Sequence, residues 1–290
     1  MNGSSSVAVN KPGAVEGFLP ISALLSFKQL ITNGIYDEVH PAGLTIFIAV
    51  LVMSLLLRKG FCGYLCPIGF VSNLLSKLGR KTKHIIKVTG KIEFVLLIPK
   101  YIAGAFFLNA VFFKMGPRAT SSFIHSSFNY TGEARMLHFF THLGLVSALV
   151  IASIVILCIF IPYFWCRFLC PYGALLGVIS KLSPIAVKRN QDLCIKCGKC
   201  SKVCPGGIQV ETKTIINSSE CIGCTQCIGS CPVNDCLTLT DRLSRKRRPW
   251  ATIAIGCVFI LMLYYVTAVV TNHWDSPLPN EMLRRYYINM

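Results

Sequence analysis

Two cysteine runs with the same spacing lie close together in the C-terminal half of the chain. CIKCGKCSKVCP occupies residues 194–205 and CIGCTQCIGSCP occupies residues 221–232. Both read Cys-x2-Cys-x2-Cys-x3-Cys-Pro, a spacing by which thiolates hold pairs of [4Fe–4S] clusters. Three cysteines of each run ligate one cluster, and the fourth ligates the other cluster. Paired Cys-x2-Cys motifs also bind zinc, but two complete runs, each closed by proline, favour iron and sulfur.

The spacing predicts one ligand set for each cluster. The first set is Cys194, Cys197, Cys200 and Cys231, and the second is Cys221, Cys224, Cys227 and Cys204. A disulfide-stapled secreted domain is another use of many cysteines. It is disfavoured because most of the 15 cysteines fall in short ligand spacings between lysines. We expect residues 191–241 to form a small α+β domain that resembles bacterial two-cluster ferredoxins and transfers single electrons.

Lysines flank these runs, and their role stays open at this point. The flanking residues are Lys196, Lys199, Lys202 and Lys213. Each thiolate-ligated cluster is net negative, so nearby lysines would offset that charge and favour reduction. The same lysines could instead form a solvated face or a docking surface for an acidic partner.

The remainder of the chain has the composition of a membrane protein. Hydrophobic residues make up 53% of the chain and charged residues only 14%, which is too apolar for a soluble globular domain. A bilayer core of about 30 Å needs about 20 apolar residues in a helix. Four segments reach or approach this length, namely 42–57, 92–113, 143–165 and 250–270. The amphipathic segment 18–33 is expected to lie along the outer interface, with a fifth span as the weaker alternative.

Basic residues are concentrated in two of the loops between these spans. Eight lie between the first two spans and thirteen between the last two, of 29 in the chain. Because loops rich in Lys and Arg stay in the cytoplasm, we expect both cysteine-bearing loops to be cytoplasmic in a prokaryotic membrane, with both termini outside. The basic run at 245–248 directly precedes a span, so we interpret it as an orientation anchor and not as a nucleic-acid-binding patch.

This interpretation divides the chain into five parts. They are an outer N-terminal segment (1–41), a transmembrane repeat (42–190), the ferredoxin-type domain (191–241), a C-terminal transmembrane helix (242–271) and an outer tail (272–290). The tail is expected to pack on a partner or to anchor at the lipid interface through Trp274, Tyr286 and Tyr287.

A second cysteine motif occurs twice, 104 residues apart. Residues 61–79 read FCGYLCPIGFVSNLLSKLG, and residues 165–183 read WCRFLCPYGALLGVISKLS. Each copy follows a predicted span and leads into an amphipathic helix. We therefore expect a pseudo-two-fold repeat about an axis along the membrane normal, with the two loops facing each other. Four thiolates suffice for a third cluster, with Cys62, Cys66, Cys166 and Cys170 as ligands. A redox-active disulfide, or reduced cysteines that only pack, are the alternatives.

In combination these motifs resemble the NapH-type membrane ferredoxins, with NosR-type and CcoG-type proteins as more distant relatives. The resemblance covers about residues 18–240 and rests on CGYLCP at 62–67, CRFLCPYGALLG at 166–177 and the two ferredoxin runs. It implies a subunit that passes electrons between quinone or quinol and a partner oxidoreductase. No nucleotide-binding or flavin-binding motif is evident in the sequence, so the substrate-specific step is expected in another subunit. CcoG-like metal reduction during cofactor assembly, and redox sensing, are the alternative functions.

Ionisable residues in or beside the spans are candidates for a quinone site. Lys100 lies near the middle of the second span, where a charge is costly unless it faces an interior or a cavity. It could bind a quinone oxygen, balance the charge of the third cluster, or pair with Glu93. His138 and His142 share a helix face before the third span and are quinone-site or interfacial candidates, with haem ligation as a weaker alternative. Weaker proton-relay candidates are Asp37, Glu38, His40 and His125.

Overall fold

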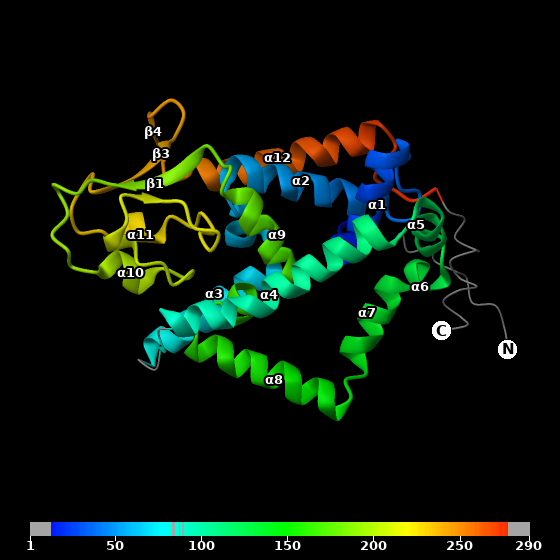
Figure 1. Cartoon of the computed structure of the whole chain (residues 1–290), viewed down its shortest axis with the longest axis horizontal. Helices are drawn as coiled ribbons and strands as arrows, with labels where there is room; N and C mark the ends of the chain where they lie inside the picture. The colour runs from blue at the N-terminus through cyan, green and yellow to red at the C-terminus, as the bar shows by residue number, and fades with distance from the viewer. Residues whose placement is uncertain (1–12, 83–84, 87, 89, 278–290) are drawn as a thin grey trace, which may run out of the picture.

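The computed structural model describes residues 13–82, 85–86, 88 and 90–277. Long helices run along the molecule, and a small domain with a β-sheet caps one end of them (Figure 1). The expected interface anchors Tyr286 and Tyr287 lie outside the described residues. Trp274, the third expected anchor, packs edge-on against Tyr265, with ring centroids 4.7 Å apart.

Every segment predicted to cross the membrane is helical. The helices of this part are α1 (Pro20–Asn33), α2 (Pro41–Leu57), α3 (Pro67–Lys81), α4 (Lys91–Asn109), α5 (Pro117–Ile124), α6 (Ser127–Tyr130), α7 (Gly132–Thr141), α8 (Leu145–Phe160), α9 (Pro171–Ser180) and α12 (Thr252–Val270). A short 3-10 helix, η1 (Gly13–Phe18), precedes them.

Two helical segments of the described chain are long and apolar enough to cross a bilayer, Lys91–Lys114 and Thr252–Val270. Helices α7 and α8 would form a third span together, although they are bent by 85° at the break between them. The remaining predicted span, α2, has 17 residues and is about 26 Å long, slightly less than the bilayer core. By length, the described part of the chain thus has two or three candidate membrane spans, where the sequence predicted four.

Helix α2 lies at the centre of the helical part. It packs against η1, α1, α9 and α12, and Figure 1 shows it lying beside α12. A helix that is apolar on all sides is typically buried, and Leu44, Val50 and Met53 are each at most 1% exposed. In contrast, α4, α8 and α12 expose large apolar side chains such as Phe94, Leu145 and Ile255, as helices in contact with lipid do.

Helix α1 confirms the predicted helix at 18–33, but its polar stripe faces the protein. Ser22, Ser26 and Gln29 are buried, whereas Ile21 and Ile31 are exposed. Ser26 donates a hydrogen bond to the carboxylate of Asp37, so this member of the stripe has a partner inside the protein. Its placement along the outer interface stays a prediction.

The ferredoxin-type domain is built on a four-stranded antiparallel sheet with the order β2-β1-β3-β4. The strands are β1 (Ile185–Arg189), β2 (Ile215–Ile216), β3 (Leu237–Asp241) and β4 (Arg247–Arg248), and two short helices are α10 (Lys199–Val203) and α11 (Gln226–Gly229). Val187 pairs with Leu239 in register. The sheet therefore begins six residues before the predicted boundary at 191 and extends past 241.

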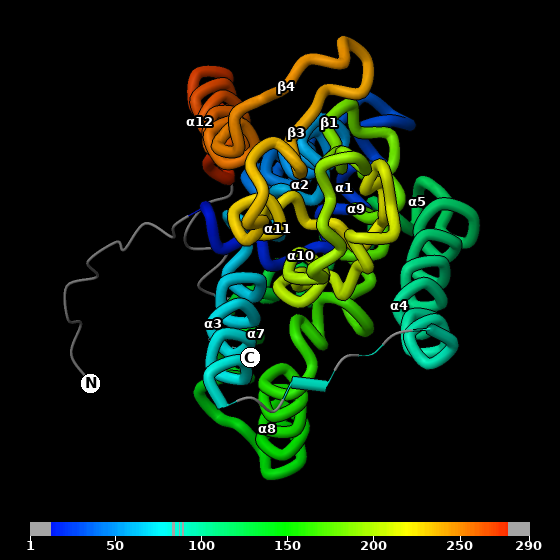
Figure 2. Tube along the Cα trace, turned by 90° about the vertical axis from the view of Figure 1, so that its left-hand side faces the viewer, coloured from blue at the N-terminus to red at the C-terminus, as the bar shows by residue number. Residues whose placement is uncertain are grey.

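The sheet and the membrane helices share one hydrophobic core. Val187 and Leu239 of the sheet belong to the same buried cluster as Met53 of α2 and Ile253 of α12. Figure 2, which views the molecule from the ferredoxin-type end, shows this domain lying over the helix ends. Because burial of this apolar surface stabilises both parts together, the domain is held rigidly over the helices and not on a flexible linker.

Candidate iron–sulfur centre

The two Cys-x3-Cys-Pro loops have the same local structure. Each forms one π-helical turn, Phe61–Leu65 and Trp165–Leu169, and each enters a helix with proline in its first turn. The amide of Cys66 donates to the carbonyl of Phe61 at 2.8 Å, and the amide of Cys170 donates to that of Trp165 at 2.9 Å. π-helical turns often occur at functional sites. The sequence repeat is thus also a repeat of backbone conformation.

Glycine is required at the same place in both loops. A Cβ atom at Gly69 would lie 2.2 Å from the carbonyl oxygen of Cys62, and one at Gly173 would lie 3.2 Å from that of Cys166. The first contact would force the backbone to move and the second is tight, so the absence of a side chain lets the first turn of each following helix lie close against the cysteine-bearing turn.

Each helix that follows a loop packs against the helix that precedes the other loop, and this arrangement brings the two loops together. Helix α3 packs on α8, and α9 packs on α2. A Cβ at Gly79 would lie 2.0 Å from the Ile159 carbonyl oxygen, so only glycine allows this approach of α3 to α8. On the other side, Ser54 of α2 donates to the carbonyl of Leu176 at 2.7 Å. Small residues therefore permit both close contacts.

All four loop cysteines line one cavity of about 910 Å³. Its polar lining near the cysteines includes Lys59, Tyr172 and Glu220, and the remainder of the wall is predominantly apolar. The cavity extends away from the cysteines to Phe18 of η1, Tyr265 of α12 and Trp274. A deep apolar space with a few polar groups at one end is typical of small-molecule sites.

The chemistry of this donor set fits an iron–sulfur cluster. Burial raises the pKa of Cys62 and of Cys166 to about 12, so both thiols hold their protons unless a metal displaces them. The Gly173 amide donates to Cys170 Sγ at 3.3 Å, and Ser72 Oγ lies 3.7 Å from Cys166 Sγ. Four thiols with hydrogen-bond donors beside them are the soft donor set that iron–sulfur clusters use. Ligation by these four cysteines stays a prediction.

The structure also brings together each ligand set predicted for the ferredoxin-type domain. The first set lines one small pocket, which Cys236 also lines. In the second set, burial raises the pKa of Cys227, and the neighbouring thiols of Cys221, Cys224 and Cys204 raise it further. Cys236, to which the sequence assigned no role, is buried in contact with Cys194 and Cys231.

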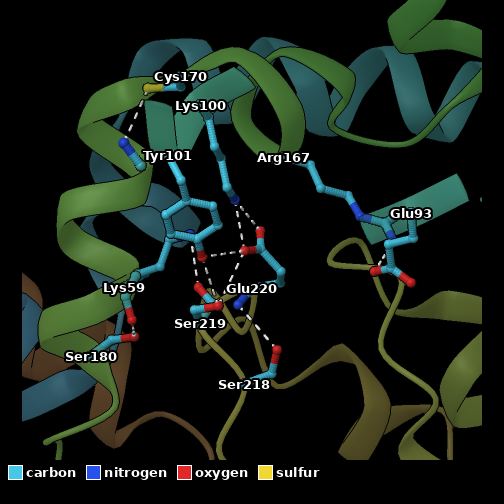
Figure 3. Close-up of polar contacts among 12 residues, drawn as sticks. Lys59, Glu93, Lys100, Tyr101, Arg167, Cys170, Ser180, Ser218, Ser219 and Glu220 are labelled. Carbon is cyan, nitrogen blue, oxygen red and sulfur yellow. Dashed lines mark hydrogen bonds and ion pairs between the residues drawn. The ribbon is translucent and has the colours of Figure 1, made fainter. Parts of the chain in front are cut away.

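A buried ion pair links helix α4 to the ferredoxin-type domain (Figure 3). Lys100 is fully buried, and its Nζ donates to the two carboxylate oxygens of Glu220 at 2.7 and 2.8 Å. Tyr101 donates to Ser219 Oγ at 3.0 Å, and Lys59 donates to the Ser219 carbonyl at 3.0 Å. Burial alone would raise the pKa of Glu220, but Lys59 and Lys100 outweigh it and hold that pKa below its ordinary value. Glu220 is therefore an anion directly before Cys221, a predicted cluster ligand.

A second ion pair lies at the second Cys-x3-Cys-Pro loop. Arg167 donates to Glu93 at 2.5 Å and to the Val88 carbonyl at 3.1 Å. Lys100 thus does not pair with Glu93, which was one expectation, because each of the two residues has a partner on another element. Arg167 also packs against Gly207, where a Cβ would lie 2.3 Å from the guanidinium. The first loop touches the same domain at Gly63, whose Cβ would lie 2.7 Å from the Ile222 carbonyl oxygen.

Gly207→Ala is expected to destabilise the contact between the second loop and the ferredoxin-type domain by about 2–3 kcal/mol. The φ of Gly207 is +67°, which is strained for alanine by about 1 kcal/mol, and the methyl group would also displace Arg167, as overpacking does. The matched control is Gly198→Ala, because Gly198 has φ +68° and no atom within 4 Å of its Cβ position. Thermal bleaching of cluster absorbance should occur at a clearly lower temperature in the Gly207 variant. Equal midpoints would contradict this account of the contact.

The expected quinone-site residues do not themselves line this cavity, and their role stays a prediction. None of Lys100, His138 and His142 is among the described residues that line the cavity. His138 and His142 lie on α7 and just after it, where they are exposed and their rings stack 4.5 Å apart. The cavity residues Lys59, Tyr172 and Glu220 were not identified from the sequence. In the sequence, Lys59 and Tyr172 lie close to the loop cysteines, and this position was the one signal that could have identified them as cavity residues.

Apolar helices, repeated cysteine loops and two ferredoxin cysteine sets define a membrane protein of the iron–sulfur electron-transfer class. The family model described as "4Fe-4S binding domain" matches residues 39–85 and again 142–190. The "4Fe-4S dicluster domain" model matches residues 187–239. The first model thus covers each copy of the repeat, including its Cys-x3-Cys-Pro loop. No solved structure matches the chain.

Three relatives of the chain are described as electron transport or ferredoxin-type proteins. The chain is 36% identical to the "Putative electron transport protein YccM" of Escherichia coli K12, over 97% of this chain and 80% of that protein. It is 24% identical to the "Ferredoxin-type protein NapH" of the same organism, over 78% and 77% of the two chains. It is 27% identical to the "Methylamine utilization ferredoxin-type protein MauN" of Methylorubrum extorquens, over 75% and 74%. The chain belongs to the NapH-type family of ferredoxin-type electron transport proteins.

Proposed function

We propose that this chain passes electrons between a lipid quinone and a partner oxidoreductase through three iron–sulfur clusters. The observation that carries the proposal is that Cys62, Cys66, Cys166 and Cys170 line the same apolar cavity. A cluster bound there would supply one-electron transfer, and the cavity would place a quinone headgroup beside it.

The third ligand set rests on the repeat. Equivalent backbone turns, equivalent glycines and the crosswise packing of α3 on α8 and of α9 on α2 favour a pseudo-two-fold bundle in which the loops face each other. Figure 2 shows α3 lying beside α8. We infer that α2, α4, α8 and α12 each cross the membrane. The distribution of Lys and Arg favours a cytoplasmic ferredoxin-type domain, with both termini outside.

The cavity fits an amphipathic ligand with a long apolar tail. Near the cysteines, the side chains of Tyr172, Lys59 and Glu220 present polar groups. Away from them, the wall consists of apolar residues such as Phe18, Leu24 and Met262. A quinone headgroup would therefore lie beside Tyr172, with its isoprenoid tail directed towards η1 and α12.

The order of the ligand sets indicates where electrons leave. The second set is close to the loops, because Tyr64 donates to the Gly223 carbonyl at 3.3 Å and Arg167 packs against Gly207. The first set lies further out, and its Cys197 is exposed. Exposed lysines, Lys196, Lys199 and Lys202, surround this set. A partner with an acidic docking face would fit there, since complementary charge steers association.

Tyr172→Phe is expected to weaken quinol use without affecting the clusters. Tyr172 stacks on Phe47, with ring centroids 5.9 Å apart, so phenylalanine keeps the packing and removes only the hydroxyl group. The loss of one hydrogen bond, about 1 kcal/mol, should raise the KM for quinol about fivefold. Reduction of the clusters by dithionite should stay unchanged. His142→Ala, a change outside the cavity lining, is the control. A larger rise in KM for His142→Ala than for Tyr172→Phe would move the quinone site to α7.

The experiment that tests the function itself uses the holoprotein in lipid nanodiscs. A short-tailed quinol added under anaerobic conditions should reduce at least one iron–sulfur cluster, seen by electron paramagnetic resonance (EPR), and the matching quinone should reoxidise it. Clusters that respond to dithionite but neither to quinol nor to quinone would contradict the proposal.

A further inference from the structure

Three potential metal ligands meet near the starts of α2 and α7, and Figure 1 shows these helix ends on the side opposite to the β-sheet. Glu16 comes from η1, His40 directly precedes α2, and Glu133 lies in the first turn of α7. They are only 2%, 3% and 7% exposed. One ligand atom from each residue lies within 4.8 Å of those of the other two. Three separate elements thus converge on one buried point.

The distances within this group fit a shared metal ion better than direct hydrogen bonds. His40 Nδ1 lies 3.5 Å from Glu16 Oε1 and 3.7 Å from Glu133 Oε1. A charge-assisted hydrogen bond between imidazolium and carboxylate would be about 2.7–2.9 Å long. Two ligand atoms that each lie about 2.1 Å from one tetrahedral ion are about 3.4 Å apart. The two separations from His40 Nδ1 are therefore close to the edge length of a coordination tetrahedron.

The second ring nitrogen of His40 fixes which atom faces the carboxylates. His40 Nε2 lies 2.9 Å from the Asn129 carbonyl oxygen. A carbonyl oxygen only accepts hydrogen bonds, so Nε2 carries the proton and Nδ1 is the atom that presents a lone pair to an ion. The Gly43 amide likewise donates to Glu16 Oε2 at 2.9 Å, which orients Oε1 towards His40. Such outer contacts are typical of metal-binding histidines and carboxylates.

We propose that Glu16, His40 and Glu133 form a binding site for a divalent cation of the zinc or manganese class. One imidazole and two carboxylates are ligands of intermediate to hard character, which suit Zn²⁺ and Mn²⁺ and disfavour Cu⁺. The ion would connect η1, α2 and α7. The site is separate from the iron–sulfur ligand sets and does not depend on the proposed quinone reaction.

The test is metal analysis of the full-length holoprotein, purified without chelators from cells grown with added zinc or manganese. We expect about one zinc or manganese ion per chain, with bound zinc showing only nitrogen and oxygen neighbours in X-ray absorption spectra. Glu133→Gln and His40→Ala should each lose that ion while iron and acid-labile sulfide stay at the wild-type level. The matched control is Glu38→Gln, which changes an exposed carboxylate two residues from His40 and should keep the ion.

Three results would overturn the proposal, two of them with the wild-type protein. One is wild-type protein that carries neither metal and whose unfolding temperature does not rise when Zn²⁺ or Mn²⁺ is added. The other is bound zinc with sulfur neighbours, which would place it at the cysteines. His40→Ala could lose the ion only because it fails to fold. Glu133→Gln is nearly isosteric and should fold, so its metal content decides the outcome. Retention of the ion by folded Glu133→Gln would also contradict the assignment.

Discussion

Replacing Cys66 and Cys170 together by serine is expected to abolish reduction of the ferredoxin clusters by quinol. The two cysteines come from different loops but line one cavity, and each directly precedes the proline that begins the following helix. Serine keeps the size of the side chain but removes a thiolate ligand from each loop. The variant should lose about four of about twelve iron atoms. Dithionite should still produce the EPR signal of the ferredoxin clusters.

The control for this experiment replaces two cysteines outside the motifs. Cys158 and Cys257 are buried in α8 and α12, where the sequence favours packing as their role. Serine at both positions should leave iron content and quinol oxidation close to the wild-type values. If the Cys66 and Cys170 variant kept its full iron content, the loops would not bind a cluster. If it lost iron but still transferred electrons from quinol at the wild-type rate, the loop centre would not be the entry point.

Replacing Lys100 by methionine is expected to cost about 3–5 kcal/mol, because it leaves the Glu220 carboxylate buried without its principal cation. Lys100 is fully buried and Glu220 is 6% exposed, so water cannot replace the lost contact. The double variant Lys100→Met, Glu220→Gln should recover much of this loss, since a buried ion pair contributes little more than well-packed neutral residues. Thermal unfolding of the holoprotein in detergent, followed by cluster absorbance, measures both effects.

A lysine on the same helix provides the control. Lys91→Met changes an exposed residue at the start of α4 and should shift stability by at most about 0.5 kcal/mol. An equally small shift for Lys100→Met would show that the ion pair does not hold the ferredoxin-type domain on α4. A double variant as unstable as the single variant would show that the cost arises from lost packing and not from an unpaired charge.

Local patterns predicted much of the architecture. Cysteine spacing located the ferredoxin-type domain, which the family match confirms, and the 104-residue offset predicted two loops of the same conformation. Runs of apolar residues located the helices, since a helix in lipid must satisfy its backbone internally. The sequence also predicted a helix at 18–33. This helix was expected to lie along the outer interface, but a stripe of serine and glutamine can equally face the inside of the protein, and the pattern alone does not distinguish the two.

The contacts that build the site could not be predicted in the same way. Lys100 and Glu220 are 120 residues apart, and their pairing depends on how the ferredoxin-type domain packs on α4. The same holds for Arg167 with Glu93, and for the convergence of Glu16, His40 and Glu133. In each case the residue type indicated a need for a partner, since buried charges are costly. Only the tertiary fold determines which partner is near.

The bend between α7 and α8 shows a further limit. The predicted third span at 143–165 is an uninterrupted apolar run, but α8 covers Leu145–Phe160 and meets α7 at 85°. His142 and Gly144 lie at this break, and His138 belongs to α7. His138, a candidate for a quinone-site or interfacial histidine, therefore lies on a separate exposed helix, and His142 lies at the break after it.

Quantification of iron and acid-labile sulfide in anaerobically purified holoprotein tests the central claim most directly, because two ferredoxin-type clusters and one loop cluster require different totals. With three [4Fe–4S] clusters we expect about twelve iron atoms and about twelve sulfides per chain, with a third component in the Mössbauer spectrum. A fully loaded protein with about eight of each, and with all four loop cysteines reactive to a thiol reagent, would contradict the account.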